Sequence, residues 1–346
     1  AKPLGHKGQE VVRGQPIAAA QGLVSVPMHA PATGVVKAIE LRPTAAGPKT
    51  ESIVIDVYQG DSQEVLYEVP RDMERLSPAE ILQAVHDCGM VGQGGAAFPS
   101  HVKLKVPDGK AVDTLVVNGC ECEPYLTCDH RIMLEQTADV LAGARIIMRG
   151  LGVGRAMIGV EDNKLDAVQA LQALIRQDAE RNRGISTHAV QTKYPQGAEK
   201  MLIESLLHRQ VPTGGLPMDV GVVVFNVGSL AQLGQLLPRG RGHIERVLTV
   251  SGPGVERPGN YLAPVGTPVR FLLEQAGVKP GRREVILGGP MMGMAVSSLD
   301  VPVTKAMSGL VVMGAELDDG DLKPRPVYPC IRCARCVEAC PMHLNP

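Results

Sequence analysis

Hydrophobic and polar positions change their spacing twice along the chain. The first part holds brief β-branched runs separated by Gly and Pro, at residues 11–20, 24–40 and 52–58. Runs of this kind predict the short strands of an all-β module. Near residue 77 the pattern becomes helical, because Ser77, Pro78 and Glu80 supply the cap, the first-turn proline and the closing glutamate of a helix start.

The middle of the chain alternates strand-like and helix-like segments. Strands separated by long helices are typical of a parallel, doubly wound sheet. The predicted strands are 113–118, 156–161, 185–194 and 220–226, and the predicted helices are 131–150, 165–181, 198–208 and 229–237. After residue 243, short strands surround a single predicted helix at 267–277, which favours a small α+β module of the β-grasp type.

Composition narrows the class of protein without changing this picture. With 346 residues, a formal net charge of −1 and 44% hydrophobic residues, the chain is neither disordered nor suited to wholesale electrostatic binding of nucleic acid. The many turn formers, 39 Gly and 27 Pro, exclude a helical bundle. No apolar run reaches the roughly 18 residues of a membrane span. The chain lacks an initial Met and ends just after a cysteine motif, so we expect it to be a piece of a longer polypeptide.

The strongest motif lies at the end of the chain. Cys330, Cys333, Cys336 and Cys340 form C-x2-C-x2-C-x3-C-P, the bacterial ferredoxin spacing for a [4Fe–4S] cluster. In two-cluster ferredoxins the fourth cysteine binds the other cluster, so Cys340 predicts a second one. A zinc knuckle would need two C-x2-C pairs with a longer loop between them, and disulfides this close in sequence would be strained. The motif indicates electron transfer in a reducing compartment.

Four further cysteines lie earlier in the chain, at Cys88, Cys120, Cys122 and Cys128. The spacing C-x-C-x5-C matches no standard metal site. A packing role is favoured over metal binding, which stays open.

Two polar loops precede or follow predicted strands. Gly92, Gly94 and Gly95 stand ahead of Lys103, and glycines this dense let backbone N–H groups approach an anion while the lysine adds charge. A simple turn is the alternative. Glu121 and Glu123 follow a strand, and ligands of parallel sheets bind beyond the carboxyl ends of strands. We expect both carboxylates to point the same way, since they are two apart on an extended segment; a solvated acidic turn is the alternative.

Several motifs together resemble a known family. They are G-x-G-G-A-x-F-P-x-x-x-K, N-x-x-E-x-E-P-Y, K-Y-P-Q-G-x-E-K, N-V-G and G-G-P-x-M-G, in this order. As a set they resemble the RnfC family of the Rnf electron-transport complexes, and they are similar to the flavin- and NADH-binding subunit of respiratory complex I. The resemblance covers essentially the whole chain.

The resemblance implies four modules. These are a barrel-sandwich module like those that carry biotin or lipoate (1–65), a Rossmann-like domain that binds FMN and NADH (76–240), an SLBB β-grasp domain (243–315), and a linker with the start of a ferredoxin-type [4Fe–4S] domain (316–346). A carrier needs a lysine at the hairpin tip, where this chain has Ser25-Val26-Pro27-Met28. We therefore expect a structural module without a covalent cofactor.

The same resemblance implies the site residues. Those matched to FMN are Gly92, Gly94, Gly95, Lys103, Asn118, Glu121, Glu123, Tyr194, Gly197, Asn226 and Val227. Those matched to NAD(H), the substrate, are Phe98, Glu123 and Glu199. Two positions depart from the family pattern: Ala97 replaces a usual glycine, and Cys120 stands where the complex I protein has an aspartate.

The implied function is that of a peripheral subunit of a membrane-bound, ion-translocating ferredoxin:NAD oxidoreductase on the cytoplasmic face of a bacterial inner membrane. Electrons would pass between NAD(H), FMN and [4Fe–4S] clusters, two of them in the full-length chain. The expected partners are integral-membrane Rnf subunits and a ferredoxin-type iron–sulfur subunit. Two alternatives stay open: a soluble flavin and iron–sulfur cobalamin reductase, and a ligand-binding scaffold with a structural cluster.

Overall fold

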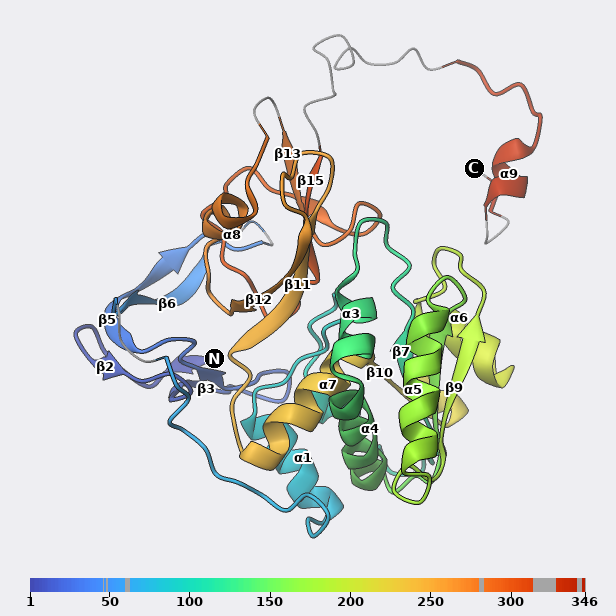
Figure 1. Cartoon of the computed structure of the whole chain (residues 1–346), viewed down its shortest axis with the longest axis horizontal. Coiled ribbons are helices and arrows are strands. Elements are labelled where there is room, and N and C mark those ends of the chain that lie inside the picture. Colours follow the sequence, from blue (N-terminus) through green and yellow to red (C-terminus); the bar gives the residue numbers. More distant parts are fainter. Residues whose placement is uncertain are drawn as a thin grey trace.

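A computed structural model describes residues 1–45, 47, 49–59, 63–279, 283–313, 328–340 and 344–345. Figure 1 shows the first strands in blue beside the helices of a central α/β domain, with the orange strands of a third module next to both. Most of the predicted linker, 316–327, lies outside the described residues. Among the described helices, none is long and apolar enough to cross a membrane.

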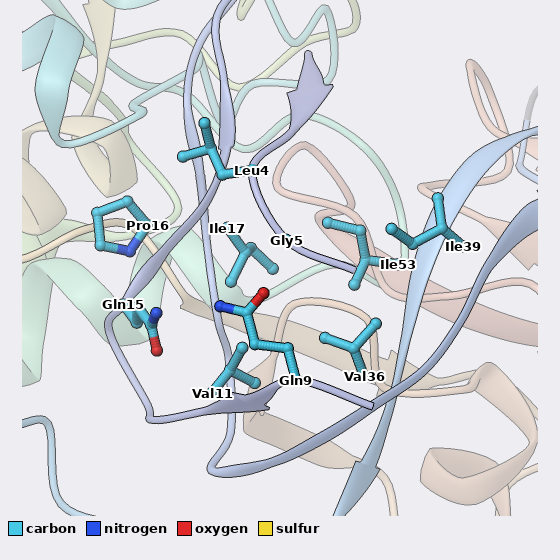
Figure 2. Close-up of a pocket in the computed structure, with 10 residues that line it drawn as sticks. All are labelled: Leu4, Gly5, Gln9, Val11, Gln15, Pro16, Ile17, Val36, Ile39 and Ile53. Carbon is cyan, nitrogen blue, oxygen red and sulfur yellow. The ribbon is translucent and has the colours of Figure 1, made fainter. Parts of the chain in front are cut away.

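Two three-stranded antiparallel sheets form the first module, which confirms the expected barrel sandwich. One sheet has the order β1-β3-β4 and the other β2-β5-β6. The strands are β1 (Lys2–Pro3), β2 (Glu10–Val11), β3 (Pro16–Ala19), β4 (Met28–His29), β5 (Gly34–Arg42) and β6 (Thr50–Val57). Figure 2 shows side chains of both sheets around a cavity of about 110 Å³. This is below the roughly 300 Å³ of small ligand pockets.

The hairpin tip of this module is held against the rest of the chain. His101 Nε2 lies 3.2 Å from the carbonyl oxygen of Leu23, and Lys305 Nζ donates to the carbonyl of Pro27 at 3.3 Å. In a carrier domain this tip has to be free to move. Here its backbone contacts two other modules instead.

A four-stranded parallel sheet with the order β10-β7-β8-β9 is the centre of the α/β domain. Alternate residues of the strands face opposite layers: Leu115 and Val117 pack with α1, α3, α4, α5 and α7, whereas Val116 packs with α6. The elements are α1 (Pro78–Asp87), α2 (Ser100–Lys103), β7 (Thr114–Gly119), α3 (Cys128–Glu135), α4 (Thr137–Leu151), β8 (Ala156–Glu161), α5 (Leu165–Gln177), β9 (Ile185–Val190), α6 (Glu199–Leu207), η1 (Pro217–Val220), β10 (Val222–Asn226), α7 (Val227–Leu236) and η2 (Leu237–Arg239). The predicted helix start is confirmed, since Ser77 and Glu80 form a capping box.

Three predicted elements differ most from the structure. The helix expected over 131–150 is two helices, because the backbone leaves the helical region at Gln136 (φ −122°, ψ 30°). The strand expected to reach residue 194 ends at Val190, because its neighbour β8 ends opposite it at Glu161 and offers no further partner. The helix expected to reach residue 181 ends at Gln177.

Helices α4 and α7 cross with their backbones in contact. A Cβ on Gly143 would overlap the carbonyl oxygen of Leu230, and a Cβ on Gly234 would overlap that of Asp139. Only glycine permits so close an approach of the two helix backbones. The first turn of α7 lies at the strand ends because the helix begins directly after β10.

The third module is a five-stranded sheet with the order β12-β11-β15-β13-β14 and one packed helix, as expected for a β-grasp fold. Its elements are β11 (Glu245–Ser251), β12 (Gly259–Pro264), α8 (Val269–Ala276), β13 (Glu284–Leu287), β14 (Met294–Ala295) and β15 (Gly309–Met313). The cysteine segment that follows contains the short helix α9 (Arg335–Ala339).

Candidate functional site

The predicted strand-end residues meet at one edge of the parallel sheet. Asn118 and Asn226 are paired neighbours at the ends of β7 and β10. The Asn118 amide donates to the carbonyl of Gly197 at 2.8 Å, which ties the start of the α6 segment to the sheet. Gly94 lies on the other side, where a Cβ would stand 3.7 Å from that of Asn226. Four segments far apart in sequence therefore meet at this edge of the sheet.

The backbone of the glycine loop is closed by a hydrogen bond, and its outer side is open to solvent. The N–H of Gly92 donates to the carbonyl of Phe98 at 2.8 Å, so the residues between them form a compact turn. Residues 94–98 are exposed, and Phe98 is the least polar of them at 39% exposure. Gly95 adopts φ +104°, and a Cβ there would meet nothing within 4 Å. A loop this open leaves room for an anion to approach its backbone N–H groups.

Lys103 extends from α2 to the ends of two other elements. Its Nζ donates to Glu199 at 2.8 Å and to the carbonyl of Val224 at 3.0 Å, and it lies 5.9 Å from the ring centre of Phe225. The lysine thus joins the first residue of α6 to β10. Lys103, which was matched to FMN, and Glu199, which was matched to NAD(H), therefore form one ion pair.

The carboxylates of Glu121 and Glu123 do not act in the same direction, contrary to expectation. Glu121 is buried and accepts the N–H groups of Asp129 (3.0 Å) and His130 (3.2 Å) at the start of α3. Glu123 accepts the N–H groups of Met291 (2.9 Å) and Met292 (2.7 Å) from the third module. The physical reason is that each carboxylate is drawn to a different pair of backbone donors.

Burial gives Glu121 unusual acid–base behaviour. Desolvation, with the nearby charge of Asp129, raises the pKa of Glu121 to about 7. Desolvation also raises the pKa of Asp129. Burial therefore disfavours the ionised form of both neighbouring carboxyl groups. Tyr194 lies on the other side, where desolvation and the carboxylate of Glu123 raise its pKa.

Sequence reasoning missed Asp129. Its Oδ2 accepts the Asn226 amide at 2.6 Å, while Asn226 Oδ1 accepts the N–H of Ser229 and caps α7. Both the nitrogen and the oxygen of the Asn226 side-chain amide are therefore held by hydrogen bonds. Val227, the next residue, is fully buried and begins α7. An acidic residue in the first turn of a helix was the available signal, but it is too common to single out.

The support beneath the glycine loop was also missed. Gln93 is buried; its N–H donates to Ser229 Oγ at 2.9 Å, and its Nε2 lies 3.1 Å from His243 Nε2. Lys305 Nζ donates to the carbonyl of Gly89 at 2.6 Å. His243 and Lys305 come after the α/β domain in sequence, so no local pattern connects them to this loop.

A buried ion pair supports the strand next to β7. Lys164 Nζ donates to Glu161 at 2.6 Å and lies 3.4 Å from the carbonyl oxygen of Glu121. A buried pair of this kind adds little net stability, because the cost of desolvating both charges offsets their attraction.

The cysteines divide as their positions suggest. Cys330, Cys333 and Cys336 are exposed and Cys340 is half-buried. Arg332 and Ala334 adopt positive φ between them, so the backbone turns tightly, and the N–H of Arg332 lies 3.4 Å from Cys330 Sγ. Within the described ranges, no three His, Cys, Asp or Glu side chains are grouped to hold a metal ion. Exposed thiols of this spacing suit an iron–sulfur cluster.

The earlier cysteines lie mainly in the core. Cys88, Cys120 and Cys128 are buried, and Cys122 is half-buried. Burial raises the pKa of the Cys88 thiol to about 12 and raises those of Cys120 and Cys128 as well. Buried thiols that stay protonated are consistent with the expected packing role of these cysteines.

A second cavity, of about 630 Å³, lies between the barrel sandwich and the α/β domain. It is lined by His29, Tyr67, Arg71, His86 and Arg241 among others. None of the predicted site residues contributes to it.

Three parts of the chain match known domain families. Residues 85–235 match the Nuo51 FMN-binding domain, residues 1–59 the RnfC barrel sandwich hybrid domain, and residues 247–295 the SLBB domain. The chain is 43% identical, over 99% of its length, to the C subunit of the proton-translocating ferredoxin:NAD(+) oxidoreductase complex of Clostridium ljungdahlii and covers 74% of that protein. The chain belongs to the RnfC family.

A second relative supports the same family assignment. The C subunit of the Na(+)-translocating ferredoxin:NAD(+) oxidoreductase complex of Acetobacterium woodii is 41% identical over 99% of this chain, which covers 76% of that protein. The chain is thus the RnfC subunit of an ion-translocating ferredoxin:NAD(+) oxidoreductase (Rnf) complex and carries an FMN-binding domain. This decides against the cobalamin reductase and the scaffold.

Solved structures support the fold. A chain of an NAD+-reducing [NiFe]-hydrogenase in the air-oxidized state aligns with a TM-score of 0.61 at 24% identity, covering 69% of this chain and 47% of that chain. The H2-reduced state aligns with a TM-score of 0.60.

Proposed function

We propose that the carboxyl ends of β7 and β10 border a crevice in which FMN binds, and that NAD(H) approaches the flavin there. The observation that carries this proposal is the convergence of the glycine loop, the two strand-end asparagines and the start of the α6 segment. When bound, FMN supplies hydride exchange with NAD(H) and single-electron transfer. The chain contributes binding, orientation and exclusion of water.

Each part of the crevice has a role in this proposal. Gly92, Gly94, Gly95 and Lys103 hold the phosphate and ribityl chain, and the remaining flavin contacts come from Asn118, Glu121, Glu123, Tyr194, Gly197, Asn226 and Val227. Phe98 offers a stacking surface for the nicotinamide nucleotide, with Glu123 and Glu199 at its border. The Asn226 amide, fixed by Asp129, presents a constant pattern of donors and acceptors.

Anaerobic visible absorbance of the purified protein, before and after NADH, tests this function. A flavin band that is bleached by NADH is the expected result. Absence of the band, or a band unchanged by NADH, would contradict it.

We also propose two [4Fe–4S] clusters in the full-length protein. Cys330, Cys333 and Cys336 bind one, with a fourth ligand outside the present sequence, and Cys340 serves the other. The 346-residue chain should then hold an incomplete, air-labile centre, and Cys340→Ser should leave its iron content unchanged. About four stably bound irons, lost in Cys340→Ser, would show that Cys340 completes the first cluster.

The remaining assignments concern the assembly. We propose a peripheral position on the cytoplasmic face of the inner membrane, in contact with integral-membrane Rnf subunits and a ferredoxin-type iron–sulfur subunit. We also propose the module boundaries 1–65, 76–240, 243–315 and 316–346.

A further inference from the structure

The turn at residues 289–293 of the third module is bound to the α/β domain by one carboxylate. Glu123 Oε2 accepts the N–H of Met291 at 2.9 Å, and Oε1 accepts the N–H of Met292 at 2.7 Å. Two successive backbone donors form a small anion-binding nest, and hydrogen bonds to an ionised carboxylate are stronger than neutral ones. This turn lies within the G-G-P-x-M-G motif, to which no function has so far been assigned.

The glycines of the motif make this contact possible. The N–H of Gly293 donates to the carbonyl of Gly289 at 2.7 Å and closes the turn. A Cβ on Gly289 would lie 2.5 Å from Cδ of Glu123, inside any real carbon–carbon contact. The φ of Gly289 is not in the left-handed region, so the glycine is required by the carboxylate and not by the backbone.

The neighbouring residues reinforce the attachment. Ser251 Oγ donates to the carbonyl of Tyr125 at 2.6 Å, and the N–H of Thr127 donates to Thr249 Oγ1 at 3.0 Å. Alternate residues 123, 125 and 127, which follow β7, therefore all contact the third module. The strand end that borders the proposed flavin crevice is thereby bounded by a second domain.

The turn also presents an apolar surface beside that crevice. Met291, Met292 and Met294 are 55%, 79% and 50% exposed. Methionine side chains adapt to irregular partners, including aromatic rings. Glu123, which holds the turn, also lies close enough to Tyr194 to raise the pKa of its hydroxyl.

We propose that the turn Gly289–Gly293 is a wall of the NAD(H) site and that Glu123 is the positioning residue that holds it in place. This inference rests on the proposed function, because it takes the crevice beside Glu123 as the nucleotide site. Both oxygens of Glu123 are used by the turn, so its effect on NAD(H) acts through the turn.

Two variants break the same contact from opposite sides. Glu123→Gln replaces one acceptor oxygen by an N–H2 group that faces an N–H donor, and Gly289→Ala inserts a methyl against the carboxylate. Matched controls are Glu284→Gln, an exposed carboxylate on β13, and Gly259→Ala, where the nearest atom to a Cβ is 3.7 Å away.

Hydrogen–deuterium exchange and NADH kinetics of the FMN-loaded protein provide the test. Both variants should speed exchange of the 291–292 amides by about tenfold or more and raise KM for NADH by a similar factor, with rates expressed per bound FMN. Gly289→Ala, which alters no proposed flavin contact, should keep the FMN content of the parent. The controls should match the parent, and the double variant should add little to either single one. Unchanged exchange would overturn the role of Glu123, and faster exchange with unchanged KM would overturn the wall. A parent that lacks flavin or fails to oxidise NADH would instead refute the proposed function.

Discussion

Lys103 is the residue whose charge bears most directly on cofactor binding. Its ammonium group already has two oxygen partners, Glu199 and the carbonyl of Val224, and a phosphate would add to these. Lys103→Ala should weaken FMN retention by roughly 1.5–3 kcal/mol, or about 10- to 100-fold in Kd, without unfolding the chain. Equilibrium dialysis measures this, with the exposed neighbour Lys105→Ala as control. Equal FMN occupancy in parent and variant would remove Lys103 from the site.

The buried side chain of His29 makes the stability of the protein depend on pH. Burial, with the positive charge of Lys305 nearby, lowers the pKa of His29 to about 4. In the unfolded chain the imidazole has a pKa near 6.5, so between these values the unfolded state binds more protons. The stability associated with neutral His29 is complete above about pH 6.5 and is lost as pH falls towards 4. Glu121, whose pKa is raised to about 7, has the opposite slope over part of this range.

Comparison with His29→Gln isolates the histidine contribution, because the amide does not titrate. Between pH 7.5 and 5, the parent should lose on the order of 1–2 kcal/mol more of its free energy of unfolding than the variant. Thermal or urea unfolding at both pH values measures the difference. Parallel pH profiles would show that His29 is not the titrating group.

At the scale of elements, the crossing of α4 and α7 positions the first turn of α7 and with it Asn226. Gly234→Ala would gain about 1 kcal/mol of helix propensity but would drive a methyl into the backbone of α4, which cannot give way as a side chain can. The net result should be a loss of roughly 2 kcal/mol in the free energy of unfolding. Gly154→Ala, with no atom within 4 Å of the new methyl, is the control. A variant as stable as the parent would mean that the helices separate freely.

At the scale of the whole molecule, Lys305 joins three modules through one ammonium group. It lies on the third module, donates to Gly89 of the α/β domain and reaches Pro27 of the barrel sandwich. Burial lowers the pKa of Lys305 to about 8. This contact gives the barrel sandwich a structural role, in which its hairpin tip supports the helix end that precedes the glycine loop.

Lys305→Met should therefore loosen the junction, because two carbonyl groups lose their donor at roughly 1–3 kcal/mol each. We expect a Tm lower by several degrees and faster proteolysis between the first two modules. The exposed Lys279→Met serves as control. If scanning calorimetry and proteolysis give the same result for parent and Lys305→Met, the lysine does not hold the junction.

The sequence by itself determined the local features. The alternation of strands and helices predicted the parallel sheet, Ser77 and Glu80 predicted a capping box, and the cysteine spacing predicted the cluster segment. The capping box and the cysteine motif depend on residues within a few positions of one another, where the chain itself sets backbone geometry and side-chain reach. The parallel sheet follows from the order of the elements, because long helices connect successive strands. The motifs also identified which strand ends would matter.

Only the tertiary structure decided what those residues touch. The partners of Glu123 are 168 and 169 residues away, Lys103 and Glu199 form a pair across 96, and Lys305 meets Gly89 across 216. Glu121 and Glu123 diverge for the same reason, since the backbone donors that attract them belong to different domains. Contacts of this range depend on how the modules pack, and a local pattern carries no information about that packing.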